Sequence, residues 1–152
     1  MSTISKHDLF NAIERLLPVD TVDTCWDPDG PLRVALDDTS FYVPTLEEVE
    51  AFLEQLDLDT SDNHGEACDC DNIAKELDVE ADKYARDDLG LNLEMSLGRA
   101  DGFFYWAQDG EERHHCNWVY LRGDEFKWID GKTMECYEKE RCRPRSLRAL
   151  ES

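Results

Sequence analysis

Three side chains whose chemistries fit together occur in order along the chain. Cys70 supplies a thiol in the segment Cys68–Ala74, where a polar loop gives way to a helical pattern. His115 supplies an imidazole and Asp130 a carboxylate, both in strand-like segments. Nucleophilic catalysis by cysteine needs a thiol, a base that takes its proton and a group that orients the base. These residue types, in this order, are therefore the parts of a cysteine nucleophile system.

The two later residues would meet on a β-hairpin. Gly123–Asp124 suits a two-residue loop with glycine at its first central position. That loop pairs Asn117 with Asp130, and because side chains alternate between faces, His115 shares a face with both. A three-residue loop would slip the register by one residue and bring the two neighbours of His115 to the face of Asp130 instead.

The surroundings of the thiol suggest a cation. A helix N-terminus favours the thiolate of Cys70, because the positive end of the helix dipole lies there. Asp69 and Asp71 flank the thiol and oppose that effect, since a nearby like charge raises the pKa of a thiol. A cation on these carboxylates, or the imidazolium of His115 close by, resolves the conflict. We therefore expect a Ca²⁺ site formed by Asp69, Asp71 and Asn72.

A second interpretation makes the same thiols metal ligands. Cys68 and Cys70 could bind Zn²⁺ together with His114, His115 or Cys116. We rank this below Ca²⁺, because Cys-x-Cys is a less common zinc spacing than Cys-x-x-Cys. In a chain with six cysteines, any one of them is also commonly a small core residue.

The charge of the chain limits its partners. Among 152 residues, 36 acidic side chains face 16 basic ones, which gives a formal net charge of −20. Such a chain repels phosphates, so we expect no direct binding of DNA or RNA. A solvated surface suited to high salt, a set of carboxylates for a cation and a mimic of nucleic acid could each explain the acidity.

The first residues contain no apolar segment of the kind a signal peptide needs, and no run reaches membrane-spanning length. We therefore expect a protein of the reducing cytoplasm without a membrane partner. Its cysteines should be free thiols, metal ligands or one special thiol, rather than disulfides.

Local patterns predict helices first and strands later, which is an α+β order. Ser5 should cap a helix that Pro18 stops, and Thr45 with Glu48 forms the capping box of a second helix. Three further predictions are a short hairpin of 32–36 with 41–43, a helix from about 70 to 86, and strands over 91–97, 102–107, 113–121 and 126–129.

The chain length fits one domain, 1–152. Within it we expect a helical N-terminal part over 1–60, a core that carries the site over 61–135, and a basic tail over 136–152. A basic tail on an acidic body more often docks to its own body or to a partner subunit than to nucleic acid.

At these residues the chain resembles a known family. Cys-Asp-Asn-Ile-Ala opening a helix, His-x-Asn-Trp on a strand and an aromatic-Ile-acid ending the next strand are similar to the papain-like C-terminal domain of the Marasmius oreades agglutinin type. Agglutinin-like proteins of tailed viruses are similar as well. The match spans residues 66 to 133. It implies a papain-like fold in which N-terminal helices, one with the nucleophile at its N-terminus, pack on a C-terminal antiparallel sheet.

Residue by residue, the resemblance makes Cys70 the nucleophile, His115 the base and Asp130 the orienting acid. It also implies Ca²⁺ near Asp71 and Asn72, because the domain resembled is a calcium-activated cysteine protease. The family pattern has Asp where Asn72 stands, and Glu-Pro-Gln where Asp130-Gly-Lys stands. The oxyanion would be held by the backbone N–H of Cys70 and one further donor, for which the candidates are Gln55, Asn63 and His64.

Three functions follow from these observations. The first is a virus-encoded cysteine hydrolase that cleaves a peptide or isopeptide bond of a protein or peptide substrate. The second is a non-enzymatic protein of a virion or its assembly that keeps the fold and binds virion subunits. The third is an acidic inhibitor that occupies the basic groove of a host protein. The protein would then be found in the host cytoplasm or in the virion.

Overall fold

The computed structural model describes the backbone of residues 2–17, 21–22, 32–36, 38–56, 68–105, 111–130, 134–138 and 147–151. Side chains are described for the same residues apart from 21–22, 32–33, 68–72, 101–105, 111–115 and 147–151. Within these limits the chain is a mixed α+β structure with three α-helices and two β-sheets, as the order of the local patterns predicts.

The helices begin where their capping residues indicate. In α1 (Lys6–Leu16) the side chain of Ser5 accepts a hydrogen bond from the backbone N–H of Asp8, which confirms the predicted cap. A full capping box between Thr45 and Glu48 opens α2 (Leu46–Gln55), also as predicted. Helix α3 (Cys68–Lys83) continues into a π-helical turn, η1 (Tyr84–Asp88).

A small three-stranded sheet joins distant parts of the chain in the order β1-β4-β5. It contains β1 (Thr3–Ser5), β4 (Ser40–Tyr42) and β5 (Glu94–Met95). The predicted hairpin of 32–36 with 41–43 is therefore wrong, because β4 pairs with β1 and β5 and not with the strand just before it. The part of the chain before residue 60 also contributes strands, and is not purely helical.

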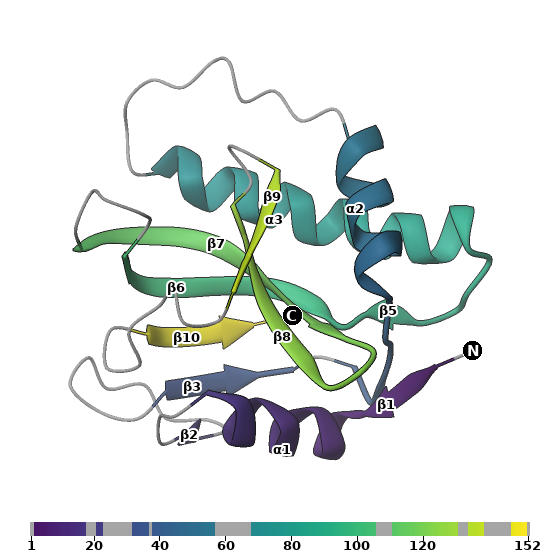
Figure 1. Ribbon diagram of the computed structural model, residues 1–152, viewed down its shortest axis with the longest axis horizontal. Helices are drawn as coiled ribbons and strands as arrows, with labels where there is room; N and C mark the ends of the chain where they lie inside the picture. The colour runs from purple at the N-terminus through teal and green to yellow at the C-terminus, as the bar shows by residue number, and fades with distance from the viewer. Residues whose placement is uncertain are drawn as a thin grey trace.

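A larger sheet has seven strands in the order β2-β3-β10-β6-β7-β8-β9. Their bounds are Thr21–Val22 for β2, Leu32–Ala35 for β3, Leu97–Tyr105 for β6, Glu111–Leu121 for β7, Glu125–Asp130 for β8, Glu135–Glu138 for β9 and Leu147–Glu151 for β10. Strands β6 to β9 form an antiparallel meander, of which the hairpin of β7 with β8 was expected and β9 was not, whereas β2 with β3 and β3 with β10 are parallel pairs. The last strand, β10, thus lies inside the sheet, next to β6 (Figure 1).

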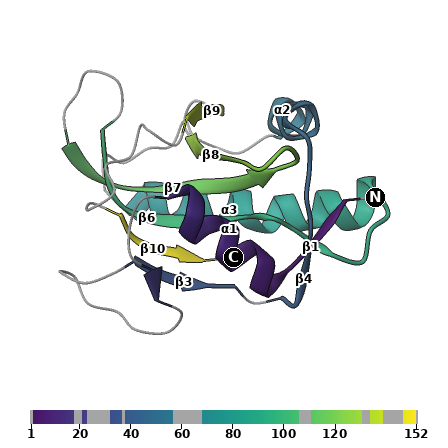
Figure 2. The ribbon, with the colours of Figure 1, turned by 60° about the horizontal axis from the view of Figure 1, so that its bottom comes forward.

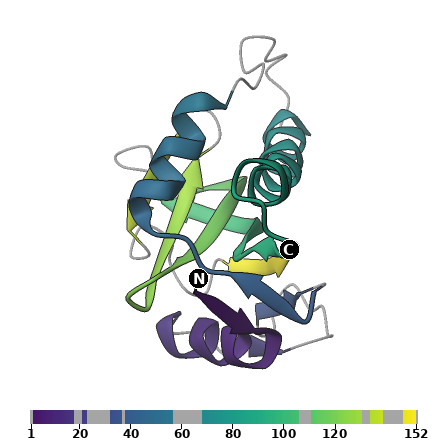
Figure 3. The same cartoon turned by 90° about the vertical axis from the view of Figure 1, so that its right-hand side faces the viewer.

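Two apolar cores lie on the two faces of β7 and β8. On one face Trp118 and Trp128 pack with Leu9 and Ile13 of α1. On the other face Val119 and Ile129 pack with residues of α2 and α3, among them Phe52 and Leu77. Figures 2 and 3 show the same division, with α1 on one side of the meander and α2 and α3 on the other. Alternation along β7 therefore assigns each of its residues to the α1 face or to the α3 face.

Within the described residues, no helix combines the length and the apolar character needed to cross a membrane.

Candidate functional site

Cys70 is the third residue of α3, so the thiol-bearing residue does stand in the first turn of a helix. Backbone N–H groups in a first turn have no partner within the helix and carry the positive end of its dipole. The predicted Ca²⁺ ligands Asp69, Asp71 and Asn72 lie in the same turn. Their side chains, like that of Cys70, are outside the described part, so the calcium site stays a prediction.

A buried asparagine fastens α3 to the sheet just beyond this turn. The side chain of Asn117 on β7 has no exposed surface, and its Nδ2 donates to the carbonyl oxygens of Ala74, 2.9 Å away, and Gly98, 3.0 Å away. Both acceptors are carbonyls, so the amide nitrogen must face them. This places β7, β6 and the second turn of α3 in direct contact.

The next turn of α3 makes a second connection. Asp78 lies 3.6 Å from Arg99 of β6, and this ion pair is largely shielded from solvent, at 13% and 32% side-chain exposure. Farther along, Leu77 and Ala81 join the core that contains Val119 and Leu121. Later residues of α3 therefore lie against later residues of β7, so the helix and the strand run in the same direction. Figure 1 shows the same relation, since both elements begin at the same end of the molecule.

This shared direction allows the positions of Cys70 and His115 to be compared by counting back from Ala74 and Asn117. Cys70 is four residues, about 6 Å, before Ala74 on α3. His115 is two residues, about 7 Å, before Asn117 on β7. Because the side chain of Asn117 bonds to the carbonyl of Ala74 and the elements run the same way, we expect the backbones of Cys70 and His115 to be neighbours. Alternation also puts His115 on the α3 face, together with Asn117.

The pairing of Asn117 with Asp130, predicted from a two-residue loop, is wrong. The hairpin register pairs Asn117 with Ile129 and Leu121 with Glu125, so the loop holds three residues, 122–124, instead of two. This is the slipped register, in which Asp130 falls on the α1 face with Trp128 and Cys116. Alternation from Trp128 therefore assigns Asp130 to the α1 face, and its orienting role stays a prediction.

On its other side, β7 pairs with β6. The register of β6 with β7 pairs Asp101 directly with His115, and Arg99 with Asn117. Sequence analysis did not single out Asp101, which lies in the aromatic run after Gly98. Its alternation with Leu97 and Arg99 could have assigned it to a face, but the pairing of the two strands could not be known from local patterns.

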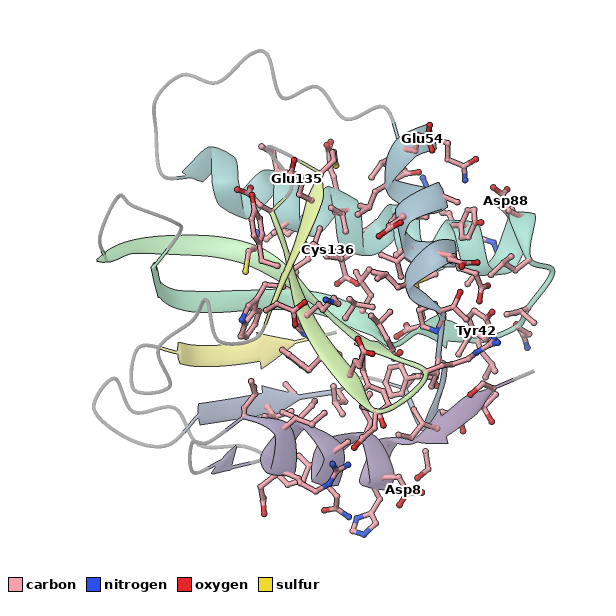
Figure 4. All side chains as sticks on the ribbon, in the orientation of Figure 1. Asp8, Tyr42, Glu54, Asp88, Glu135 and Cys136 are labelled. Atoms are coloured by element: carbon pink, nitrogen blue, oxygen red, sulfur yellow. The ribbon has the colours of Figure 1, made fainter. Side chains whose placement is uncertain are left out.

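Two other candidates are displaced from the site. Gln55 bonds to Asp88 through its Nε2, at 3.3 Å, and Asp88 is at the far end of the α3–η1 segment from Cys70 (Figure 4). Gln55 is therefore not the second oxyanion donor. Asn63 and His64 lie outside the described residues. The zinc site cannot combine Cys116 with Cys70, because Cys116 is buried on the α1 face, away from α3.

A groove of about 900 Å³ lies between the end of α2 and the outer side of α3. Charged residues such as Lys75, Glu80 and Asp88 dominate its lining. The α3 residues along it are not those that contact the sheet, so this groove is separate from the junction of α3 with β7. Among the described residues, no group of three or more His, Cys, Asp or Glu is arranged to hold a metal ion.

Two titrating groups outside the junction are strongly perturbed. Burial, and next the charges of Glu94 and Asp38, raise the pKa of Asp82 to about 7. Its Oδ1 is buried without a hydrogen-bond partner among the described residues. Burial, and next the charge of Glu50, raise the pKa of Cys136 on β9 to about 11 (Figure 4). Cys136 is therefore a poor nucleophile at neutral pH.

No family model matches the chain, and no curated protein matches it. Two solved structures of fungal lectins share its fold. A complex of PSL1a with E-64 has a TM-score of 0.68 at 12% identity, over 99% of this chain and 50% of that one. Polyporus squamosus lectin bound to the human-type influenza-binding epitope Neu5Acα2-6Galβ1-4GlcNAc has a TM-score of 0.59 at 10% identity, over 99% and 49%. The chain thus spans about half the length of each lectin, and at such identities the likeness establishes the fold alone.

Proposed function

We propose that this chain is a papain-like cysteine hydrolase of peptide or isopeptide bonds, with Cys70 as the nucleophile and His115 as the base. The observation that carries the proposal is the bond from Asn117 to the carbonyl of Ala74. It holds the strand that bears His115 against the helix that bears Cys70, at a point one helical turn and two strand residues away from the pair.

The chemistry follows from these positions. His115 takes the proton of the Cys70 thiol, and the sulfur forms a bond to the acyl carbon of the substrate. The oxygen that becomes negative receives a hydrogen bond from the backbone N–H of Cys70, in the first turn of α3. The imidazolium returns its proton to the departing amine as the C–N bond breaks. Water, deprotonated by the same imidazole, then hydrolyses the thioester and restores the thiol.

The first similar structure suggests a probe for this chemistry, because it is a complex with E-64. This chain shares its fold with half of the PSL1a chain, so E-64 is a suitable probe here.

The test measures which thiol of the intact chain reacts. E-64 and iodoacetamide are added at pH 6 to 8, and the modified cysteines are found by mass spectrometry of peptides. We expect rapid modification of Cys70, a strong loss of rate in His115→Gln and no such product in Cys70→Ser. Cys136 is the internal control, since burial raises its pKa to about 11 and should keep it slow. Equal, slow labelling of every thiol would exclude the hydrolase.

A second candidate is a non-enzymatic protein that uses the same fold for binding, as in the virion or assembly role. The specific observation in its favour is that both similar structures are lectins, one of them bound to a sialylated glycan. That likeness fits a binding function more directly than a peptidase. A direct test is titration of the intact chain with Neu5Acα2-6Galβ1-4GlcNAc, followed by NMR. Saturable shifts, together with an unreactive Cys70, would favour this candidate, and absence of binding would remove its glycan form.

A further inference from the structure

The groove between α2 and α3 has an apolar floor. It holds about 900 Å³, and α2 and α3 lie side by side around it (Figure 3). The rings of Phe52 and Tyr84, with centroids 5.3 Å apart, line it together with Leu56 and Val79. Among the described residues, Val79 is the large apolar side chain left exposed, at 52%. A concave site of this volume with an apolar floor is the usual form of a ligand site.

A π-helical turn forms one end of the groove. The N–H of Leu89 donates to the carbonyl of Tyr84, five residues earlier, at 3.1 Å. Such turns are rare and are frequent at functional sites. Tyr84 lines the floor, and Asp88 at the end of the turn accepts a hydrogen bond from Gln55 of α2 at 3.3 Å. The two walls of the groove are therefore joined at this end.

The rim of the groove is acidic. Two of its carboxylates are already balanced by cations, because Lys83 lies 3.3 Å from Glu80 and Arg86 lies 2.9 Å from Asp87. The described lining contains four acids and two lysines, namely Glu76, Glu80, Asp87 and Asp88 against Lys75 and Lys83.

The other two carboxylates have no cation beside them within the described part of the chain. Glu76 forms no ion pair there, and Asp88 bonds only to the neutral amide of Gln55. Burial, and next the charges of Asp88 and Glu48, raise the pKa of Tyr84, so negative potential reaches the floor of the groove. Glu76 and Asp88 are separated by 12 positions of α3 and η1, which is about 18 Å of helix.

We propose that this groove binds a short, extended basic peptide, whose two cationic side chains pair with Glu76 and Asp88 while an apolar side chain between them packs on Val79. An extended chain advances about 3.3 Å per residue, so cations about five positions apart match the separation of the two carboxylates. The net charge of −20 attracts such a peptide and repels an acidic one. This binding site is separate from Cys70 and does not depend on the proposed hydrolase.

The test is an NMR titration of the intact chain with the end-blocked peptide Lys-Ser-Leu-Ser-Leu-Lys at about 0.05 M salt. We expect saturable shifts of the Val79 methyl groups and the Tyr84 ring. Two control peptides separate the charge from the apolar contact: Glu-Ser-Leu-Ser-Leu-Glu and Lys-Ser-Ser-Ser-Ser-Lys should each bind about tenfold more weakly or not at all. Equal binding of the peptide without leucine would reduce the effect to general attraction by the acidic chain and overturn the proposal, as would shifts confined to another surface.

Variants of exposed groove residues locate the contacts. Glu76→Gln and Asp88→Asn should each weaken binding about threefold, as expected when one exposed charge pair is lost. Val79→Ser should weaken it about fivefold, because the apolar contact is removed. The matched control is Glu125→Gln, which removes the same charge from an exposed position on β8, outside the groove, and should leave the affinity unchanged. An equal loss in Glu125→Gln and Glu76→Gln would contradict the proposal.

Two other occupants of the groove would also overturn the proposal. Nuclear Overhauser contacts from the Val79 methyl groups to residues 57–67, undisturbed by the peptide, would show that the chain fills its own groove. Shifts at Val79 that depend on protein concentration without peptide would show that a second copy fills it. The titration does not use the Cys70 thiol and should be the same in Cys70→Ser, so failure of the hydrolase and failure of this inference are observed separately.

Discussion

The hydrogen bond between α3 and β7 can be removed by one substitution, Asn117→Ala. The Asn117 side chain is fully buried and its Nδ2 donates two hydrogen bonds, at 2.9 and 3.0 Å, to the carbonyls of Ala74 and Gly98. The substitution removes both and leaves their acceptors in a dry interior. It does not alter a charge or a residue of the proposed reaction.

The loss of stability can be worked out from these contacts. Each hydrogen bond contributes about 1 kcal/mol net, and the small cavity costs about 1 kcal/mol more. In compensation, Asn117 Oδ1 is itself buried without a partner among the described residues, and its removal recovers about 1 kcal/mol. We therefore expect the free energy of unfolding to fall by about 2 kcal/mol in Asn117→Ala.

Urea unfolding, followed by the fluorescence of the buried Trp118 and Trp128, measures this difference. The matched control is Ser96→Ala, which removes a buried hydrogen bond from Oγ to the carbonyl of Tyr120, 2.7 Å away, and no bond to α3. It should cost about 1 kcal/mol. Under native conditions only Asn117→Ala should slow the alkylation of Cys70. A cost below about 0.5 kcal/mol, or equal slowing in both variants, would refute the reasoning.

Three further outcomes are expected. The pKa of Asp82 is raised by burial to about 7, so its ionisation disfavours the folded state. Between about pH 4 and pH 7 the unfolded chain releases a proton that the folded chain retains, and stability falls as the pH rises. Asp82→Asn should remove this dependence and, after allowance for partial solvent exposure, stabilise the chain by about 1–2 kcal/mol at pH 8, measured by urea unfolding; equal stabilisation at pH 4 and 8 would contradict it. Burial raises the pKa of Cys136 to about 11, so its alkylation rate should rise about tenfold per pH unit from pH 7 to 10. A rate that reaches a plateau below pH 9 would contradict this expectation. Gly90 has φ +69° with open space around its Cα, so Gly90→Ala should cost about 1 kcal/mol in thermal unfolding from backbone strain alone; an unchanged melting temperature would argue against that strain.

Local signals in the sequence predicted what local interactions determine. Ser5 and Thr45 cap α1 and α2 because their side chains bond to backbone N–H groups only three residues away. The start of α3 near Cys70 was predicted within two residues for a similar reason, since its apolar stripe repeats at helical spacing.

Pairings between distant segments could not be predicted in this way. The strand at 32–35 has a neighbour in sequence that looks like a hairpin partner, yet it pairs with β10 from the opposite end of the chain. Residues 147–151, expected to belong to a basic tail, fill the place between β3 and β6 in the large sheet. The rest of the basic segment, 139–146, is outside the described residues. No local propensity distinguishes such a strand from a tail, because its partners come from elsewhere in the fold.

The hairpin register differs from the predicted one by a single residue because of side-chain contacts made outside the turn. Gly123-Asp124 suits a two-residue loop, but in the structure both residues have positive φ within a three-residue loop. The hydroxyl of Tyr120 donates to Asp124 at 2.8 Å, and Arg15 of α1 forms an ion pair with the same carboxylate. These contacts hold Asp124 in place and come from side chains that the turn pattern does not include.

This one-residue difference decides which residue of β8 lies across from Asn117. With a two-residue loop the residue across from Asn117 is Asp130, and with three it is Ile129. The pairing of Asp101 with His115 does not depend on that loop, because β6 joins β7 on the other side, where Leu97 with Val119 and Ala100 with Cys116 occupy the two separate cores. A slip there would exchange buried apolar residues for charged ones along the whole pair. The register of β6 with β7 is therefore the more strongly determined of the two.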